Sequence, residues 1–207
     1  MHQGFRTVGL LALFNAVAMS GTPMMMLIGS IIGTRLASDP QWATLPIALM
    51  VVGQAIAVVP AARAMSQVGR QRALWLFLLL GVAASLLATQ ALARENFTLF
   101  CTAAVLFGAT NAALQQVRFA AMESVPLDRG PTAASIIMCA GIVAAFLGPE
   151  MAVWGKDFSG VEYQGSFLLA TGCFLLAGAL LFAYTPAQPF GHSHADATRS
   201  WGQMLAN

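Results

Sequence analysis

Long apolar runs separated by short polar connectors make up most of the chain. Each run has about the 20 mainly apolar residues that a helix needs to cross a bilayer. None alternates polar and apolar residues as a strand of a membrane barrel does, so the pattern predicts an all-α membrane protein with six transmembrane helices. The expected spans are residues 7–33, 42–65, 73–93, 97–120, 131–154 and 165–186.

The same pattern divides the chain into two parts. Residues 1–186 form the expected six-span transmembrane domain, in which the connectors are short. Residues 187–207 have the composition of a soluble segment and are expected to form a cytoplasmic tail or the start of a central linker.

The beginning of the chain also resembles a secretory signal peptide. Arg6 precedes an apolar stretch, and the sequence Ala18-Met19-Ser20 resembles a cleavage site. The apolar sequence continues at once through TPMMMLIGSIIG, so an uncleaved first span is favoured over a cleaved signal peptide.

Composition excludes several classes of protein. Only 9% of the residues are charged and 58% are hydrophobic, whereas soluble domains carry roughly 25% charged residues. The net charge is +2 and the basic residues are scattered, so no nucleic-acid partner is expected. Cys101, Cys139 and Cys173 all lie within apolar runs, which gives no disulfide framework.

Basic residues predict the orientation in the membrane, because lysine and arginine are enriched in cytoplasmic loops. Six alternating spans place three basic residues on one side, namely Arg35, Arg94 and Lys156. The other side receives seven, namely Arg6, Arg63, Arg70, Arg72, Arg118, Arg129 and Arg199. That second side is expected to be cytoplasmic and to hold both termini.

Polar residues recur at helical spacing within some of the spans. Gly108, Asn111, Gln115 and Arg118 are spaced to share one face of a continuous helix. Such a face should avoid lipid and point into the bundle or toward water.

The neighbouring spans contribute further polar side chains, and together these define a candidate substrate cavity. Its expected members are Asn15, Thr22, Gln54, Asn111 and Gln115. The alternative is that these side chains only form hydrogen bonds between helices.

Catalysis within the bilayer is not expected. His2, His192 and His194 lie outside the spans, and the aspartates lie in loops or in the tail. This excludes a membrane Ser–His dyad, a His-Glu-x-x-His zinc site and an aspartyl dyad. The His-x-His sequence of the tail and the methionines of the first span are weak hints of a soft metal. We expect no catalytic residue, no cofactor and no metal site.

A basic loop, PAARAMSQVGRQRAL, follows the second run. Gly69, Arg70 and Arg72 match the signature loop of the major facilitator superfamily of membrane transporters. Ala62 and Ser66 stand where that pattern has a glycine and an aspartate. The loop is therefore similar to the family signature but lacks its carboxylate.

Two later stretches extend the resemblance. In ESVPLDRG, Glu123, Pro126, Arg129 and Gly130 match the end of span four and the start of span five in the same superfamily. Gly148-Pro149 resembles the glycine-proline motif in span five of its antiporters. The order and spacing of these motifs make the chain resemble the amino-terminal six-helix half of such a transporter.

The resemblance implies a half-bundle of two three-helix repeats within a twelve-span unit of a bacterial inner membrane. It implies ion-coupled secondary transport by alternating access, and the mostly neutral polar face of the fourth span favours a small polar or amphipathic solute. The second six-helix half would come from the same gene, from a separate chain or from a second copy. A structural or channel-type membrane subunit that transports nothing is the alternative.

The resemblance also implies a cytoplasmic charge network that controls the transport cycle. Its expected members are Gly69, Arg70, Arg72, Arg118, Glu123 and Arg129. The alternative is a loop that only sets orientation, with basic side chains reaching lipid headgroups.

Glu150 is a candidate for ion coupling, because a carboxylate whose burial changes also changes its pKa. It lies 19 residues beyond Pro131, a distance of roughly 28 Å along a helix. That length nearly equals the apolar core of a bilayer, so exposure to water at the outer end is the alternative.

Overall fold

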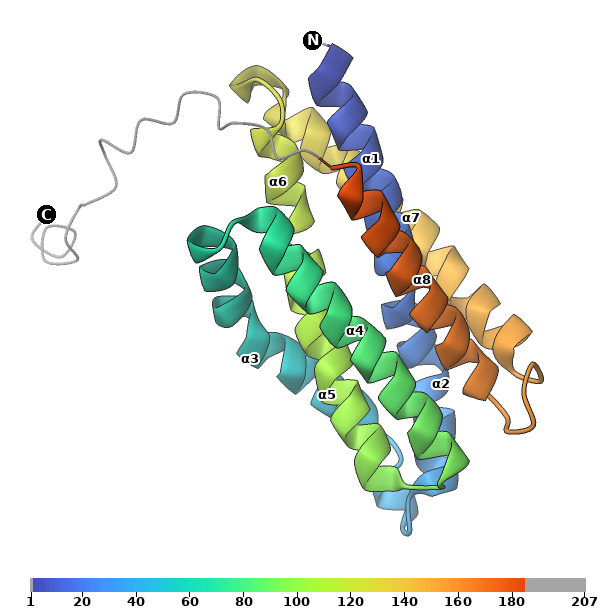
Figure 1. The fold of residues 1–207 in the computed structure, drawn as a ribbon. Coiled ribbons are helices and arrows are strands. Elements are labelled where there is room, and N and C mark those ends of the chain that lie inside the picture. The colour runs from blue at the N-terminus through green and yellow to red at the C-terminus, as the bar shows by residue number, and fades with distance from the viewer. Residues whose placement is uncertain (1, 185–207) are drawn as a thin grey trace, which may run out of the picture.

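The computed structural model describes residues 2–184, and within that range the chain is built of helices joined by short connections (Figure 1). The α-helices are α1 (His2–Ala18), α2 (Gly21–Leu36), α3 (Leu45–Gln67), α4 (Arg70–Ala93), α5 (Phe97–Leu114), α6 (Val117–Glu123), α7 (Gly130–Gly155) and α8 (Gln164–Phe182). Two short 3₁₀ turns, Pro40–Trp42 and Leu127–Arg129, precede α3 and α7.

These helices provide six segments that are long and apolar enough to cross a membrane. Their bounds are Gly4–Leu36, Pro40–Gln67, Arg70–Ala93, Phe97–Glu123, Leu127–Gly155 and Gln164–Phe182. The expected fold class, an all-α protein with six membrane-spanning helices, is confirmed for the described part of the chain. The expected tail or linker, residues 187–207, lies outside the described residues, as does Arg199.

Spans one and four are each divided into two helices. Span one consists of α1 and α2, and span four consists of α5 and α6. These two spans are also the most buried, with 61% of the residues of each apolar window buried. The corresponding share is 28% for span two and 33% for span five. The interrupted spans therefore form the inside of this six-helix bundle.

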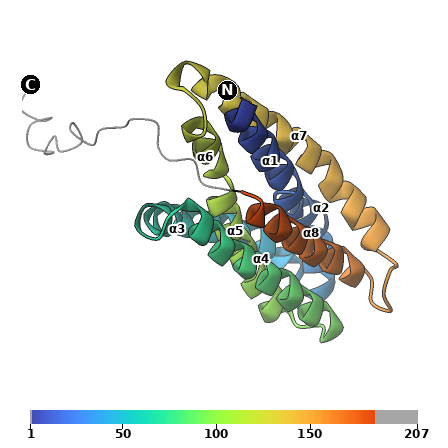
Figure 2. The ribbon, with the colours of Figure 1, turned by 45° about the horizontal axis from the view of Figure 1, so that its top comes forward.

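Side-by-side packing places α3 and α4 against α5, and places α1, α2 and α8 against α7 (Figures 1 and 2). Small residues allow the closest approaches. A side chain at Gly108 of α5 would overlap the Met50 carbonyl of α3, and one at Gly53 of α3 would overlap the Val105 carbonyl of α5. Lipid tails are as apolar as the helices, so the hydrophobic effect does not drive helices together within a membrane. Close backbone packing of this kind is therefore a main source of helix–helix stability there.

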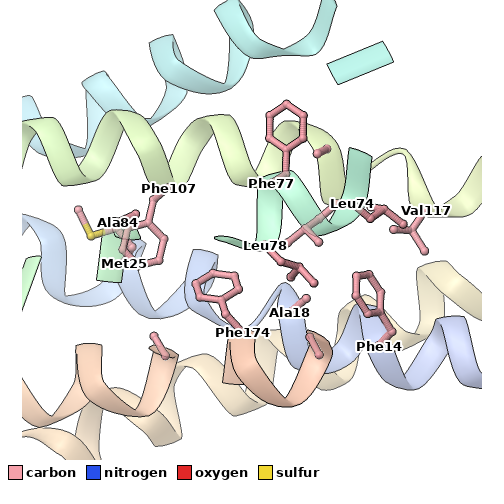
Figure 3. Packing of buried hydrophobic residues seen from close by; sticks show 14 of the residues in the cluster. Phe14, Ala18, Met25, Leu74, Phe77, Leu78, Ala84, Phe107, Val117 and Phe174 are labelled. Carbon is pink, nitrogen blue, oxygen red and sulfur yellow. The ribbon is translucent and has the colours of Figure 1, made fainter. Parts of the chain in front are cut away.

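Aromatic side chains fill the space between the helices (Figure 3). Phe107 of α5 lies with its ring centre 6.0 Å from that of Phe174 and 6.1 Å from that of Phe167, both of α8. Phe14 of α1 is also fully buried in the same core. These contacts join the interior spans to the last helix.

Candidate functional site

The polar face expected along span four is interrupted by a break in the helix. The helix α5 ends at Leu114 and α6 begins at Val117. At the break, the Gln116 N–H donates to the Ala113 carbonyl at 3.0 Å, a tighter i to i−3 bond than an α-helix makes. The structure thus separates the face into a buried part with Asn111 and an exposed part with Gln115 and Arg118.

Asn111 joins span four to span two. Its Nδ2 donates to Oε1 of Gln54 in α3 at 2.9 Å. Asn111 is only 4% exposed, and its Oδ1 has no hydrogen-bond partner among the described residues. The pair forms an interhelical hydrogen bond, the second of the two roles expected from the sequence. It also leaves one buried amide oxygen with unused acceptor capacity.

Asn15 makes an equivalent link between spans one and five. Its Nδ2 donates to the Ile137 carbonyl of α7 at 3.4 Å, and its Oδ1 likewise has no partner among the residues described. Thr22 lies partly buried in α2, and its own N–H donates to the Met19 carbonyl at 3.1 Å. Asn111 with Gln54 and Asn15 with the Ile137 carbonyl thus form separate contacts, and a role of the expected residues in one cavity stays a prediction.

Span one is interrupted next to Ser20, which is fully buried. The Ser20 hydroxyl donates to the Val17 carbonyl at 2.7 Å. Pro23, which has no N–H, follows in the first turn of α2. Gly148 of α7 packs against this break: a Cβ on Gly148 would lie 2.6 Å from Pro23 Cγ and 2.7 Å from the Ser20 carbonyl oxygen. The break in span one is therefore closed by packing.

The break in span four has the opposite surroundings, because three neighbouring side chains there are exposed. Gln115 lies at the break itself, and Arg118 and Phe119 follow in the first turn of α6. The Arg118 guanidinium lies 4.9 Å from the centre of the Phe119 ring. No carboxylate lies within salt-bridge distance of Arg118 in the part of the chain that the structure describes.

The cytoplasmic charge network expected from the sequence is centred on one ion pair. Gly69 has a φ of +89°, which L side chains rarely adopt, and this turn starts α4. Arg70, the first residue of α4, donates through Nε to Glu123 Oε2 at 2.7 Å. Its second nitrogen, Nη2, pairs with Glu123 Oε1. This two-point contact fixes the start of span three against the end of span four.

The other cations expected in that network lie apart from Glu123. Arg72 is exposed, and Arg118 lies over Phe119. Arg129 approaches Asp128 at 3.9 Å and lies 5.7 Å from the ring centre of Phe5. The structure therefore brings together only Gly69, Arg70 and Glu123 among the expected members.

Glu150 is exposed on α7, directly after Pro149. Its neighbour Gly148 is buried against span one. Exposure is the alternative that the residue count had also indicated, and a role in ion coupling stays a prediction.

A second charged cluster at the other end of the bundle was not expected from the sequence. Glu162 accepts from Arg35 at the end of α2 and pairs with Lys156 after α7, with both N–O distances at 3.3 Å. The contact with Glu162 is the main reason why the pKa of Lys156 is raised. Arg35 and Lys156 had been assigned to the same side of the membrane, and they do meet, but nothing in the sequence pointed to Glu162.

Gln71 is a further residue that sequence reasoning missed. Its Nε2 donates to the carbonyl oxygens of Leu181 at 3.1 Å and Tyr184 at 2.9 Å. A glutamine in a basic loop carries no signal for a partner more than 100 residues away. Only the packing of α4 against α8 brings these groups together.

Comparison with known proteins identifies relatives of one kind. No family model matches the chain, and no solved structure matches it. The riboflavin transporter of Brucella anthropi is 34% identical over 178 residues, which are 86% of this chain and 45% of that protein. An uncharacterised MFS-type transporter of Bacillus subtilis is 27% identical over 189 residues, 89% of this chain and 44% of that protein.

A second uncharacterised MFS-type transporter of Bacillus subtilis is 24% identical over 174 residues, or 82% of this chain and 40% of its own length. The chain thus spans about half the length of the curated relatives that it matches, and those relatives are transporters rather than enzymes. The chain is thus homologous to transporters of the major facilitator type, and its six membrane-spanning helices match one half of their length.

Proposed function

We propose that this chain is one half of an ion-coupled secondary transporter that moves a flavin-like solute by alternating access. The observation that carries the proposal is the 34% identity with a riboflavin transporter over 86% of the chain. Riboflavin joins a planar ring system to a polyol chain, which agrees with the small polar or amphipathic solute expected from the sequence.

The buried polar pairs support a role as a rigid wall of the transport path. Asn111 with Gln54 links spans four and two, and Asn15 with the Ile137 carbonyl links spans one and five. Transporters of this architecture work largely by rigid-body rocking of one bundle against another. Hydrogen bonds inside the half keep its helices together while the half moves as a unit.

The exposed face at the break in span four is the proposed solute contact. Gln115 offers an amide, Arg118 offers guanidinium donors, and Phe119 offers a ring face. Amide and guanidinium groups suit the carbonyl and hydroxyl groups of a flavin, and an aromatic ring suits its planar surface. Irregular backbone within a membrane span is tolerated where it lines a cavity, which supports placing solute at this break.

The Arg70–Glu123 pair is the proposed cytoplasmic latch of the transport cycle. It links two spans, and the Arg70 side chain is 26% exposed, so its two contacts are partly shielded from water. A half-buried two-point pair is more stable than an exposed one. In our proposal Arg72, Arg118 and Arg129 add positive charge to the same side of the bundle without contacting Glu123, and Glu150 at the far end of span five provides a titratable group for coupling.

A second six-helix half completes the solute path in this proposal. It comes from the same gene, a separate chain or a second copy, and lipid covers the remaining apolar surface. Both termini lie on the cytoplasmic side of a bacterial inner membrane, as the distribution of basic residues predicts.

The test is uptake of labelled riboflavin into vesicles that contain the native polypeptide with its second half. We expect uptake driven by an imposed proton gradient, lost in Arg70→Gln and retained in Gln90→Met, a change at an exposed position at the opposite end of α4. Uptake of other solutes but not riboflavin would exclude the flavin assignment. Equal flux with and without a gradient would favour the channel-type alternative, and no flux of any solute would favour a structural subunit.

A further inference from the structure

The first two residues of α4 hold two different spans at the cytoplasmic end of the bundle. The positive φ of Gly69 sets the direction in which α4 begins. Arg70 then contacts Glu123 of span four, while Gln71 contacts the last carbonyls of span six. Spans three, four and six therefore meet at one point.

Gln71 supplies donors to the end of α8. The Leu181 carbonyl accepts from the Tyr184 N–H at 3.2 Å as well as from Gln71, and the Tyr184 carbonyl lies just beyond the helix. Leu181 is 1% exposed and Tyr184 is 3% exposed, so water has little access to this turn. The single Gln71 amide group serves both carbonyls and fixes the place at which the chain leaves span six.

Tyr184 brings the end of span six close to the end of span four. Burial is the main cause that raises the pKa of Tyr184. The charge of Arg70 lowers this pKa, and the charge of Glu123 raises it. The side chain of Ser124, the residue after Glu123 in the chain, lies near the Tyr184 hydroxyl and lowers its pKa. Ser124 is itself 2% exposed, and its hydroxyl donates to the Ala120 carbonyl at 2.8 Å.

The contacts connect three spans at one junction. Arg70 binds Glu123 of span four, and Gln71 binds the end of span six, where Tyr184 lies near Ser124. A displacement of the chain beyond Tyr184 would act on both partners of the ion pair. Gln71 directly follows Arg70 in the chain, and Ser124 directly follows Glu123.

We propose that Gln71 and Tyr184 are positioning residues that couple the chain leaving span six to the Arg70–Glu123 ion pair. The end of span six is thus part of the cytoplasmic latch, together with spans three and four. The latch itself rests on the proposed function, whereas the coupling rests on the contacts alone.

Hydrogen–deuterium exchange of the native polypeptide in lipid nanodiscs tests the coupling without any solute. The informative amides are those of Ser124 and Val125 at the end of span four and of Ala183 and Tyr184 at the end of span six. We expect Gln71→Met to speed exchange at both pairs, by roughly fivefold or more at the remote Ser124 and Val125. Because coupling is reciprocal, Arg70→Gln should speed exchange at Ala183 and Tyr184.

Gln90→Met is the matched control on the same helix, and it should leave all four amides unchanged. The proposal is overturned if Gln71→Met speeds exchange only at the end of span six and Arg70→Gln only at the end of span four. Should Gln71→Met fail to fold, Tyr184→Phe keeps the ring and removes the hydroxyl. Faster exchange at Ser124 and Val125 in Tyr184→Phe supports the coupling, and unchanged exchange there contradicts it. A failure to transport riboflavin would refute the proposed function and leave these exchange results as they are.

Discussion

Spans one and four are both divided into two helices, yet the two breaks have opposite surroundings. The break beside Ser20 is fully buried and is packed against Gly148 of span five. The break beside Gln115 and Gln116 exposes an amide, a guanidinium and an aromatic ring. A broken helix leaves backbone groups without regular partners, which must be satisfied by packing and side chains or by a cavity. The first break is thus a structural joint, whereas the second has the features of a site.

Substitutions near the two breaks should lower the free energy of unfolding by different amounts. The largest loss belongs to Gly148→Leu, because the new side chain would collide with Pro23 and with the backbone at Ser20 and Met24. Overpacking of this kind costs about 3 kcal/mol. The measurement is unfolding of the purified protein by a denaturing detergent.

Gly141→Leu provides the control for that experiment. Gly141 lies on the same helix, and nothing lies within 4 Å of a Cβ built there. It should therefore unfold nearly as the native protein does. Equal stability of the two leucine variants would show that the break in span one is not held by close packing.

The next largest loss is expected for Gly108→Val, which probes the buried part of span four. A side chain at Gly108 would collide with the Met50 carbonyl and the backbone nitrogen of Gln54, both in α3. The expected cost is about 2 kcal/mol. Gly172→Val on α8, where a Cβ has open space, should change the unfolding free energy far less. A Gly108→Val protein as stable as Gly172→Val would contradict the close contact between spans two and four.

A smaller loss is expected for Asn111→Leu, which removes the hydrogen bond to Gln54. Side-chain hydrogen bonds between membrane helices contribute about 0.6 kcal/mol on average. Replacing both partners with apolar residues should recover part of the loss, because no polar group then stays unpaired. The double variant with Gln54→Leu completes a double-mutant cycle. A coupling energy of zero would mean that the pair does not hold the two spans together.

The smallest loss of stability, within about 0.5 kcal/mol, is expected for Gln115→Ala and Arg118→Gln at the exposed break. Under the proposed function, their effect appears in transport instead, as roughly a tenfold higher KM for riboflavin, equivalent to about 1.4 kcal/mol of binding. Uptake assays at several solute concentrations measure it. Unchanged KM in both variants would remove the distinction between a structural joint and a site.

The six spans could be predicted from the sequence, because membrane insertion depends on the summed apolarity of about 20 consecutive residues. The breaks within the spans could not. A polar face drawn through Asn111, Gln115 and Arg118 assumes a continuous helix, whereas α5 ends at Leu114. Gly148-Pro149 resembled a family motif, but only the structure shows that Gly148 packs against the break in span one.

The pairing of charges needed the structure for a similar reason. The sequence indicated four arginines as partners or neighbours of Glu123, and could not rank them. The turn at Gly69 and the packing of α4 place Arg70 alone in two-point contact with Glu123. Packing also brings Gln71 to Leu181 and Glu162 to Arg35. The two residues of each contact lie more than 100 positions apart in the chain.

The sequence by itself determined that this is a six-span membrane protein and pointed to its family, since apolar run length and short motifs are local properties of the chain. Tertiary structure alone decided which break is buried, which arginine meets Glu123, and that span six is tied to the same junction. Those outcomes depend on how helices cross and how closely their backbones approach, and a few glycines and turns control that geometry.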